Sequence, residues 1–183
     1  MHEPMQARIS RFGWVWIAVV VALPACGGQP RGPLAVPMFG ERAAVRKALA
    51  DQKYCRREGP MQPKESFDRC DEPGLELASS WVDTEYGRDG RLVAVRRFER
   101  HATHADATER WQQLVAERRR ADGEPSERAR QRIAEKIPPH AASWRSWYGD
   151  SSETHVITLY LVKSEKQSEP NVIEEMIATP ESL

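Results

Sequence analysis

The alternation of hydrophobic and polar positions is most regular between residues 103 and 121. Its hydrophobic stripe repeats at the spacing of one helical face, through Ala107, Trp111, Leu114, Val115 and Arg118. The pair Thr103 and Asp106 at the start of this stretch is similar to a capping box. Weaker stripes predict a first helix over residues 41–54 and a short one over 126–136, with Ser126 as its N-cap.

Two pairs of β-rich segments predict hairpins. Residues 75–86 and 92–99 flank an Asp89-Gly90 turn, and residues 142–148 and 154–163 flank a second polar turn at 149–152. Residues 55–74 contain several glycines and prolines, which predicts a long loop. Residues 170–178 begin with Pro170 and predict a last helix, with an apolar face of Val172, Ile173, Met176 and Ile177.

The predicted order of elements is α-β-β-α-α-β-β-α. Hairpins separated by helices favour the α+β class, with an antiparallel sheet of two hairpins and helices before, between and after them. Residues 39–178 form a single domain in this interpretation. Residues 26–38 are rich in Gly and Pro and predict a tether, and residues 179–183 predict a frayed tail.

An uncharged apolar run, FGWVWIAVVVALPA, occupies residues 12–25 and follows Arg8 and Arg11. Its 14 residues are fewer than the ~20 that a helix needs to cross a bilayer. A basic start, a short apolar run and small residues at its end are typical of an export signal. The sequence therefore predicts a signal peptide over residues 1–25.

The end of this run, Leu23-Pro24-Ala25-Cys26, resembles the lipobox of bacterial lipoproteins. Leu23 and Ala25 fit the family pattern, whereas Pro24 stands where the family prefers Ala, Ser, Thr or a β-branched residue. The resemblance implies cleavage before Cys26 and attachment of lipid, including palmitate, to its sulfur. Since Gly27 rather than Asp follows, it also implies the periplasmic face of the outer membrane. The alternatives are secretion after cleavage at Ala25 or Gly28, and an uncleaved N-terminal anchor.

The cysteine count agrees with lipidation. The chain has three cysteines, Cys26, Cys55 and Cys70, and an odd number leaves one thiol over in an exported protein. If Cys26 carries lipid, Cys55 and Cys70 are left to form one disulfide in an oxidising compartment. Two free buried cysteines are the alternative, and a metal site is disfavoured because no CxxC or Cys/His cluster is present.

Composition gives few functional clues. With 27 basic and 27 acidic side chains, the chain offers no general reason to bind nucleic acid, and we predict no nucleic-acid partner. Arg118, Arg119 and Arg120, with further arginines of the next helix, either face an anionic partner or form a solvated face of mixed charge. No GxSxG or other catalytic pattern occurs, so the sequence predicts neither an enzyme nor a cofactor.

Two groups remain as candidate sites. His101, His104 and Asp106 are weak candidates for a metal site, because a third firm ligand with defined spacing is missing. Trp144 and Trp147 are separated by an odd number of residues and should point to opposite faces of a strand. One of them, beside Tyr148, is therefore a candidate partner-binding residue.

The sequence thus predicts a non-catalytic lipoprotein of a bacterial envelope, which binds an unknown envelope protein. The alternatives are an inhibitor of an exported hydrolase, and an envelope metal-binding protein or enzyme that uses His101 and His104.

Overall fold

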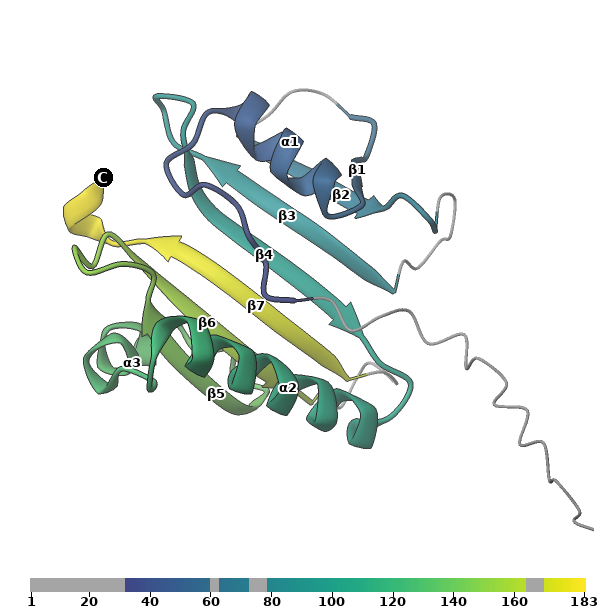
Figure 1. The fold of residues 1–183 in the computed structure, drawn as a ribbon, viewed down its shortest axis with the longest axis vertical. Coiled ribbons are helices and arrows are strands. Elements are labelled where there is room, and N and C mark those ends of the chain that lie inside the picture. Colours follow the sequence, from purple (N-terminus) through teal and green to yellow (C-terminus); the bar gives the residue numbers. More distant parts are fainter. Residues whose placement is uncertain (1–31, 60–62, 73–78, 164–169) are drawn as a thin grey trace, which may run out of the picture. The chain divides into compact units, whose positions relative to one another are not determined.

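A computed structural model describes residues 32–59, 63–72, 79–163 and 170–183 of the chain. In these ranges, seven strands form one antiparallel sheet in the order β1-β2-β3-β4-β7-β6-β5 (Figure 1). The strands are β1 (Tyr54–Arg56), β2 (Lys64–Arg69), β3 (Ser80–Tyr86), β4 (Leu92–Arg100), β5 (Ala141–Tyr148), β6 (His155–Val162) and β7 (Asn171–Ala178). The helices are α1 (Arg42–Asp51), α2 (His104–Asp122) and α3 (Glu127–Ile133), followed by the 3-10 turns η1 (Ala134–Lys136) and η2 (Pro180–Ser182). The predicted α+β class is therefore confirmed, but the predicted order of elements is not.

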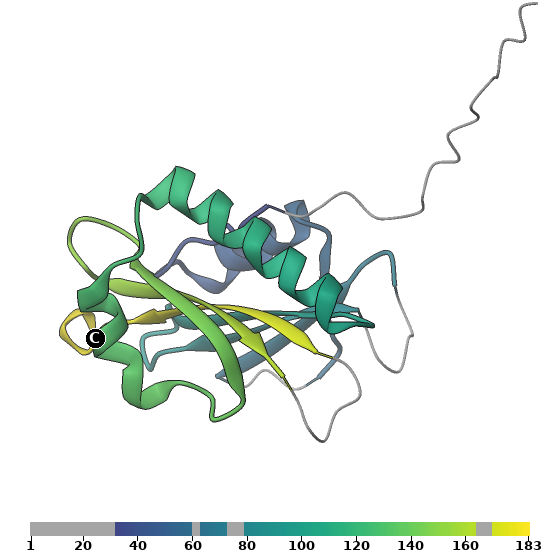
Figure 2. The ribbon, with the colours of Figure 1, turned by 90° about the horizontal axis from the view of Figure 1, so that it is seen from below.

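The two faces of the sheet are covered differently. Helices α1 and α2 lie on one face, here called the helix face, whereas α3 packs on the opposite face beside β5 (Figure 2). The alternation of β5 shows this directly, because Trp147 packs with α2 while Trp144 packs with α3. Away from α3, the face of the sheet opposite the helix face carries a stacked aromatic pair. The ring centroids of Trp81 and Phe98 lie 4.8 Å apart.

The segment predicted as the last helix is strand β7. It lies between β4 and β6 near the middle of the sheet, so both of its faces need side chains suited to burial. Its apolar residues at 172, 173, 176 and 177 fit one side of a helix, but they equally supply both faces of a central strand. The pairing with β4 and β6 overrides the helical pattern, and the helix prediction is wrong.

The predicted loop over residues 55–74 contains two strands. Tyr54 of β1 and Phe67 of β2 are buried on the helix face and join the cluster under α1. The sequence signal for β2 is weak because polar and charged residues surround Phe67. Pairing with the edge of β3 orders the segment instead.

Cys55 and Cys70 are joined by a disulfide, with their Cα atoms 5.0 Å apart. The bridge closes the open end of the β1–β2 hairpin, where Cys70 N also donates to Lys53 O at 3.0 Å. The pairing predicted from cysteine parity is therefore present. The bridge staples a hairpin at the edge of the sheet, in the segment that the sequence predicts to be a loop.

Replacing Cys55 with Ser is expected to lower the free energy of unfolding by about 3 kcal/mol, because the cross-link restricts the unfolded chain. Urea denaturation without reductant measures this loss. The double replacement of Cys55 and Cys70 is the matched control and should cost no more than the single one. An unchanged midpoint in the single variant would contradict the prediction.

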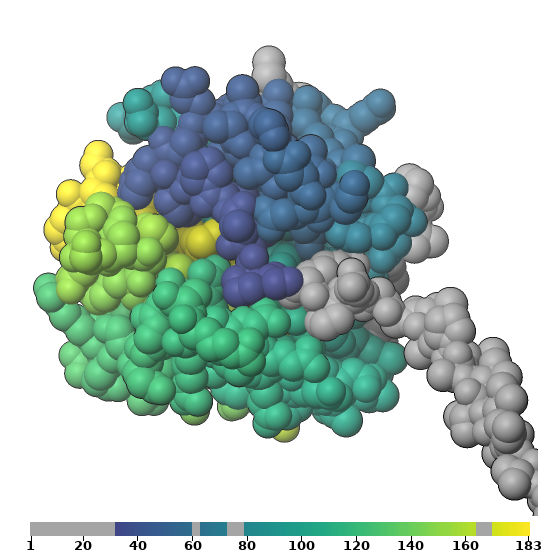
Figure 3. Space-filling view, viewed as in Figure 1, coloured from purple at the N-terminus to yellow at the C-terminus, as the bar shows by residue number. Residues whose placement is uncertain are grey.

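The two segments predicted to lie outside the domain belong to it where they are described. Residues 32–36, here called the N-terminal segment, run between α1 and α2 across the helix face (Figure 3). Leu34 in this segment is only 2% exposed and packs in the cluster under α1. At the other end, η2 returns to the domain, where Ser182 Oγ donates to Thr154 O at 2.7 Å. The described residues of the predicted tether and of the predicted tail therefore make contacts with the domain.

Candidate binding surface around strand β5

A buried group of ion pairs lies at the centre of the helix face. Arg97 of β4 and Glu174 of β7 are directly opposite in register, with Nη2 and Oε2 2.7 Å apart. Arg118 of α2 reaches the other oxygen of Glu174, also at 2.7 Å. Glu99 extends the group toward Arg110, with Nε and Oε2 2.6 Å apart. Because opposite charges meet, strands with charged residues at their centres can occupy the middle of a sheet.

The N-terminal segment is held by the same side chains. Leu34 N donates to Glu174 Oε2 at 2.9 Å, and Arg118 Nη2 donates to Leu34 O at 3.2 Å. Arg97 Nη1 donates to Gly32 O at 2.9 Å. The ion pairs therefore join three elements, the sheet, α2 and the start of the described chain.

The predicted basic stretch Arg118-Arg119-Arg120 does not form one surface. Successive helical residues point about 100° apart, and Arg118 is turned into the core, where it pairs with Glu174 and Asp122. Arg119 lies about half exposed beside Glu124, and Arg120 is exposed. Arg118 therefore has a structural role, and only Arg119 and Arg120 of the predicted stretch remain exposed to a partner.

Trp144 and Trp147 lie on opposite faces of β5, as their odd spacing predicts. Trp147 is 1% exposed, and its indole Nε1 donates to Gly123 O at 3.1 Å, so it belongs to the core. Trp144 is half-buried against α3, as is Tyr148. Of the two candidate tryptophans, only Trp144 is therefore placed to meet a partner.

Two arginine–tryptophan stacks flank edge strand β5. The guanidinium of Arg130 lies 5.0 Å from the ring centre of Trp144, and that of Arg145 lies 5.6 Å from the ring centre of Trp111. Between these arginines is an open cleft of about 380 Å³, lined by Pro125, Ser126, Glu127, Arg130, Arg145 and Ser146. We call this region the β5 surface. The sequence predicted its tryptophan and placed Arg130 in a basic stretch, but missed Arg145, and the pairing of both arginines with aromatic rings comes only from the fold.

The backbone at the β5 surface is fixed. Ser126 N donates to Ser146 O at 2.8 Å, and Ser126 Oγ accepts from Ala129 N at 3.1 Å to cap α3. The backbone that lines the cleft is therefore hydrogen-bonded across β5 and α3, and Arg130 and Arg145 lie against aromatic rings. Such partial ordering lowers the entropy that binding has to remove.

The candidate metal ligands do not converge. His104 is exposed at the first position of α2, and Asp106 accepts from Thr103 Oγ1 at 2.7 Å as part of the predicted cap. His101 is half-buried, and burial lowers its pKa. Among the described residues, no three His, Cys, Asp or Glu side chains are grouped as a metal ion would require. The arrangement therefore assigns Asp106 to helix capping.

His155 is the other half-buried histidine. Burial lowers its pKa, Asp150 raises it and Arg118 lowers it, with a net decrease. The ring packs against Gly149 so closely that a Cβ added there would lie 1.7 Å from its Nε2. This contact explains why the β5–β6 turn has a glycine at that position.

The protein is expected to lose stability as the pH falls below about 6.5, the ordinary pKa of histidine. The pKa values of His101 and His155 are depressed in the folded state, so the unfolded state binds protons first and is favoured as the pH falls through this window. Urea denaturation at pH 7.5 and pH 5.5 measures the difference. It should shrink when both histidines are replaced with Gln, and an identical difference in that variant would contradict the assignment.

Comparisons of the chain with protein-family models, with curated proteins and with solved structures find no match. In the part of the chain that the structure describes, no helix has the length and apolar character to cross a membrane. The predicted signal peptide and Cys26 lie outside the described residues.

Proposed function

We propose that the protein is a lipid-anchored, non-catalytic binding protein of a bacterial envelope. Cys26 is the lipid attachment site, and the outer membrane, on its periplasmic side, is the location. The order of residues 8–26 supports this proposal, as does the Cys55–Cys70 disulfide, which leaves Cys26 as the unpaired cysteine. Since Gly32 is already held by Arg97, only six residue steps separate Cys26 from the held part of the chain, a reach of roughly 20 Å when fully extended.

The domain binds an envelope protein through the β5 surface in this proposal. The observation that carries it is the pair of arginine–tryptophan stacks on either side of an open cleft. Tryptophan and arginine are enriched among the residues that dominate binding energy at protein interfaces. Here they combine exposed guanidinium donors with half-buried rings, which suits a partner that offers both acidic and apolar groups.

The binding site is tested by photo-crosslinking from position 127, which is exposed at the cleft, in cells that make the full chain. One stoichiometric envelope protein should be captured, and the affinity of the isolated complex should fall at least about tenfold in Trp144→Ala. Position 112, exposed on α2, provides the matched control and should capture nothing. Equal capture from both positions would overturn the proposed surface. A hydrolase as the captured partner would identify the domain as an inhibitor.

The anchor is tested separately by the intact mass of protein purified from membranes. A chain that starts at Cys26 with added acyl mass supports lipidation, and a further gain of two hydrogens on reduction reports the Cys55–Cys70 bridge. An unlipidated chain that starts elsewhere would overturn the anchor, while leaving the β5 surface open to its own test.

A further inference from the structure

Helix α1 and strand β2 gather arginines around a single carboxylate. Glu65 of β2 has a side chain only 2% exposed. Arg46 of α1 binds both of its oxygens, with Nε donating to Oε2 at 3.1 Å and Nη2 to Oε1. Arg42 Nη1 donates to Oε1 at 3.2 Å. The hydrogen bond from Arg46, and then its charge and those of Arg42 and Arg56, lower the pKa of Glu65 despite burial, so this carboxylate stays ionised.

A third arginine is held less tightly. Arg56 Nε lies 3.9 Å from Glu65 Oε1, beyond hydrogen-bond distance, and its Nη2 donates to the backbone oxygen of Gly59 at 2.9 Å. Three guanidinium groups therefore share one carboxylate, which leaves an excess of two positive charges. Each of the three arginine side chains is about a third exposed, so a ligand from solvent can reach them.

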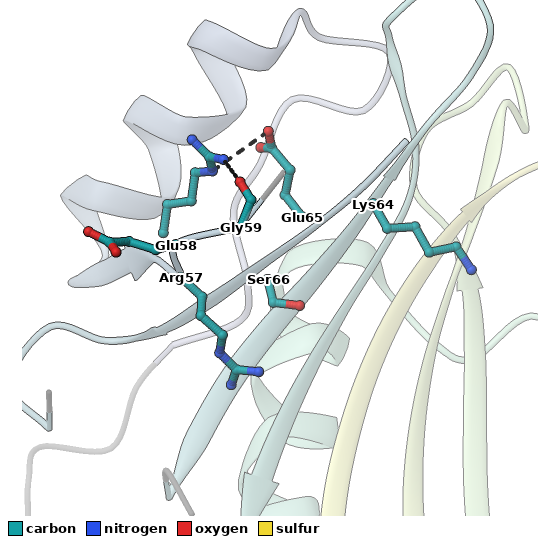
Figure 4. A pocket seen from close by; sticks show the side chains of 7 residues that line it. Arg57, Glu58, Gly59, Lys64, Glu65 and Ser66 are labelled. Atoms are coloured by element: carbon teal, nitrogen blue, oxygen red, sulfur yellow. Dashed lines mark hydrogen bonds and ion pairs between the residues drawn. The ribbon is translucent and has the colours of Figure 1, made fainter. Parts of the chain in front are cut away.

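An open notch lies beside these arginines at the edge of the sheet. It has a volume of about 240 Å³ and is lined by residues 56–59 and 64–66, several times the ~30 Å³ that one water molecule occupies in the liquid. Figure 4 shows Arg57 and Lys64 of this lining directed away from Glu65. Arg57 pairs with Asp68 at 2.7 Å and Lys64 with Glu85 at 3.5 Å, so their charges are already balanced. Glu58 also lines the notch and points outward from it in the same view.

We propose that this notch binds a phosphate group, with Arg56, which lines it, as the guanidinium donor and Arg42, on the same carboxylate, adding positive charge beside it. A phosphate monoester carries between one and two negative charges near pH 7, which matches the excess charge, and planar guanidinium groups bind its oxygens in pairs. Arg42 is held in place by its stack on Tyr86, 4.4 Å from the ring centre. Arg56 exchanges the backbone oxygen of Gly59 for a phosphate oxygen. Arg46 keeps Glu65 ionised and paired.

The proposal concerns α1, β1 and β2 and does not depend on the anchor or on the β5 surface. Two kinds of ligand share the chemistry, a free phosphorylated solute and the headgroup of an anionic phospholipid. Titration of the full-length protein in neutral detergent with inorganic phosphate tests the first kind. Titration with monomeric dihexanoyl phosphatidylglycerol tests the second, with dihexanoyl phosphatidylcholine as the zwitterionic control.

Arg56→Gln is the diagnostic variant, and Arg88→Gln, at an exposed arginine in the turn between β3 and β4, is the matched control. Binding of either anionic probe should weaken at least about tenfold in Arg56→Gln and stay within twofold of the wild type in Arg88→Gln. Binding of phosphate with this pattern identifies a solute site, and binding of phosphatidylglycerol alone identifies a headgroup site. Absence of binding to both probes, or equal weakening by the two variants, overturns the proposal. Urea midpoints of both variants confirm that they fold.

Discussion

Replacing Glu174 with Gln is expected to lower the free energy of unfolding by about 3–5 kcal/mol. The substitution keeps the shape of the side chain but removes the negative charge that Arg97 and Arg118 share at the centre of the helix face. Both guanidinium groups are buried, so water does not replace the lost partner. Breaking a buried pair by removing one member leaves an uncompensated charge, which costs far more than losing an exposed pair.

The matched control for this variant is Glu175→Gln, one residue later on the same strand. Glu175 pairs with Arg96 on the opposite face, where Arg96 is 38% exposed and stays solvated after the change. Glu175→Gln should therefore lower the free energy of unfolding by only about 1 kcal/mol. Urea denaturation of both variants gives the comparison. Equal losses would mean that the central ion pairs contribute no more than a pair of which one member is solvated.

Replacing Leu34 with Ala is expected to cost about 2–5 kcal/mol, the usual range for a buried leucine. Its side chain fills the cluster under α1 together with Val45 and Leu49 of that helix. The loss of contact also weakens the hold on the N-terminal segment, so this segment should be cut faster by proteases than in the wild type. Thermal or urea denaturation and limited proteolysis measure the two effects.

Val36→Ala is the control for this variant, because Val36 lies two residues further on and is only partly buried. Its cost should be clearly smaller. If Leu34→Ala has no more effect than Val36→Ala, the N-terminal segment is not part of the folded core and acts as a tether up to Pro37.

The elements that the sequence predicts correctly are those whose hydrophobic pattern fits only one kind of secondary structure. The stripe through Ala107 and Leu114 gives α2, and the Asp89-Gly90 turn gives the β3–β4 hairpin. The β5–β6 hairpin was found in the same way, because β6 is rich in β-branched and aromatic residues. In each case the local signal and the tertiary contacts agree, which is when sequence patterns are most reliable.

The elements that were missed depend on partners far away in the sequence. In β7, the pair Glu174-Glu175 interrupts an apolar run, a pattern that also fits the solvated side of a helix. The pair Arg96-Arg97 interrupts β4 in the same way, and in the sheet the two pairs face each other across the strands. Two doublets of opposite charge, each flanked by apolar residues, are a signal for neighbouring central strands that single-segment patterns do not reveal.

Of the candidate site, the sequence predicts only the features that follow from the alternation of side chains along a strand. Alternation along β5 correctly predicts that Trp144 and Trp147 lie on opposite faces of the sheet. It does not predict which of the two is buried. Side-chain partners such as Arg145 and Trp111 come from different elements and are joined only by packing. The same holds for Arg56 and Glu65, which sequence analysis did not single out.

The hydrogen bonds that Glu174 and Arg118 make with the backbone of Leu34 also determine where a mechanical load enters the domain. A pull on the chain ahead of Gly32 acts first on the contact of Gly32 with Arg97 and then on those of Leu34 with Glu174 and Arg118, in the middle of the sheet. Edge strands β1 and β5 are not in this load path, so they are not peeled away one hydrogen bond at a time. The Cys55–Cys70 disulfide is not in this load path either, because both cysteines follow α1 along the chain. Under tension, the resistance of the domain is therefore set by a few charged side chains at its centre.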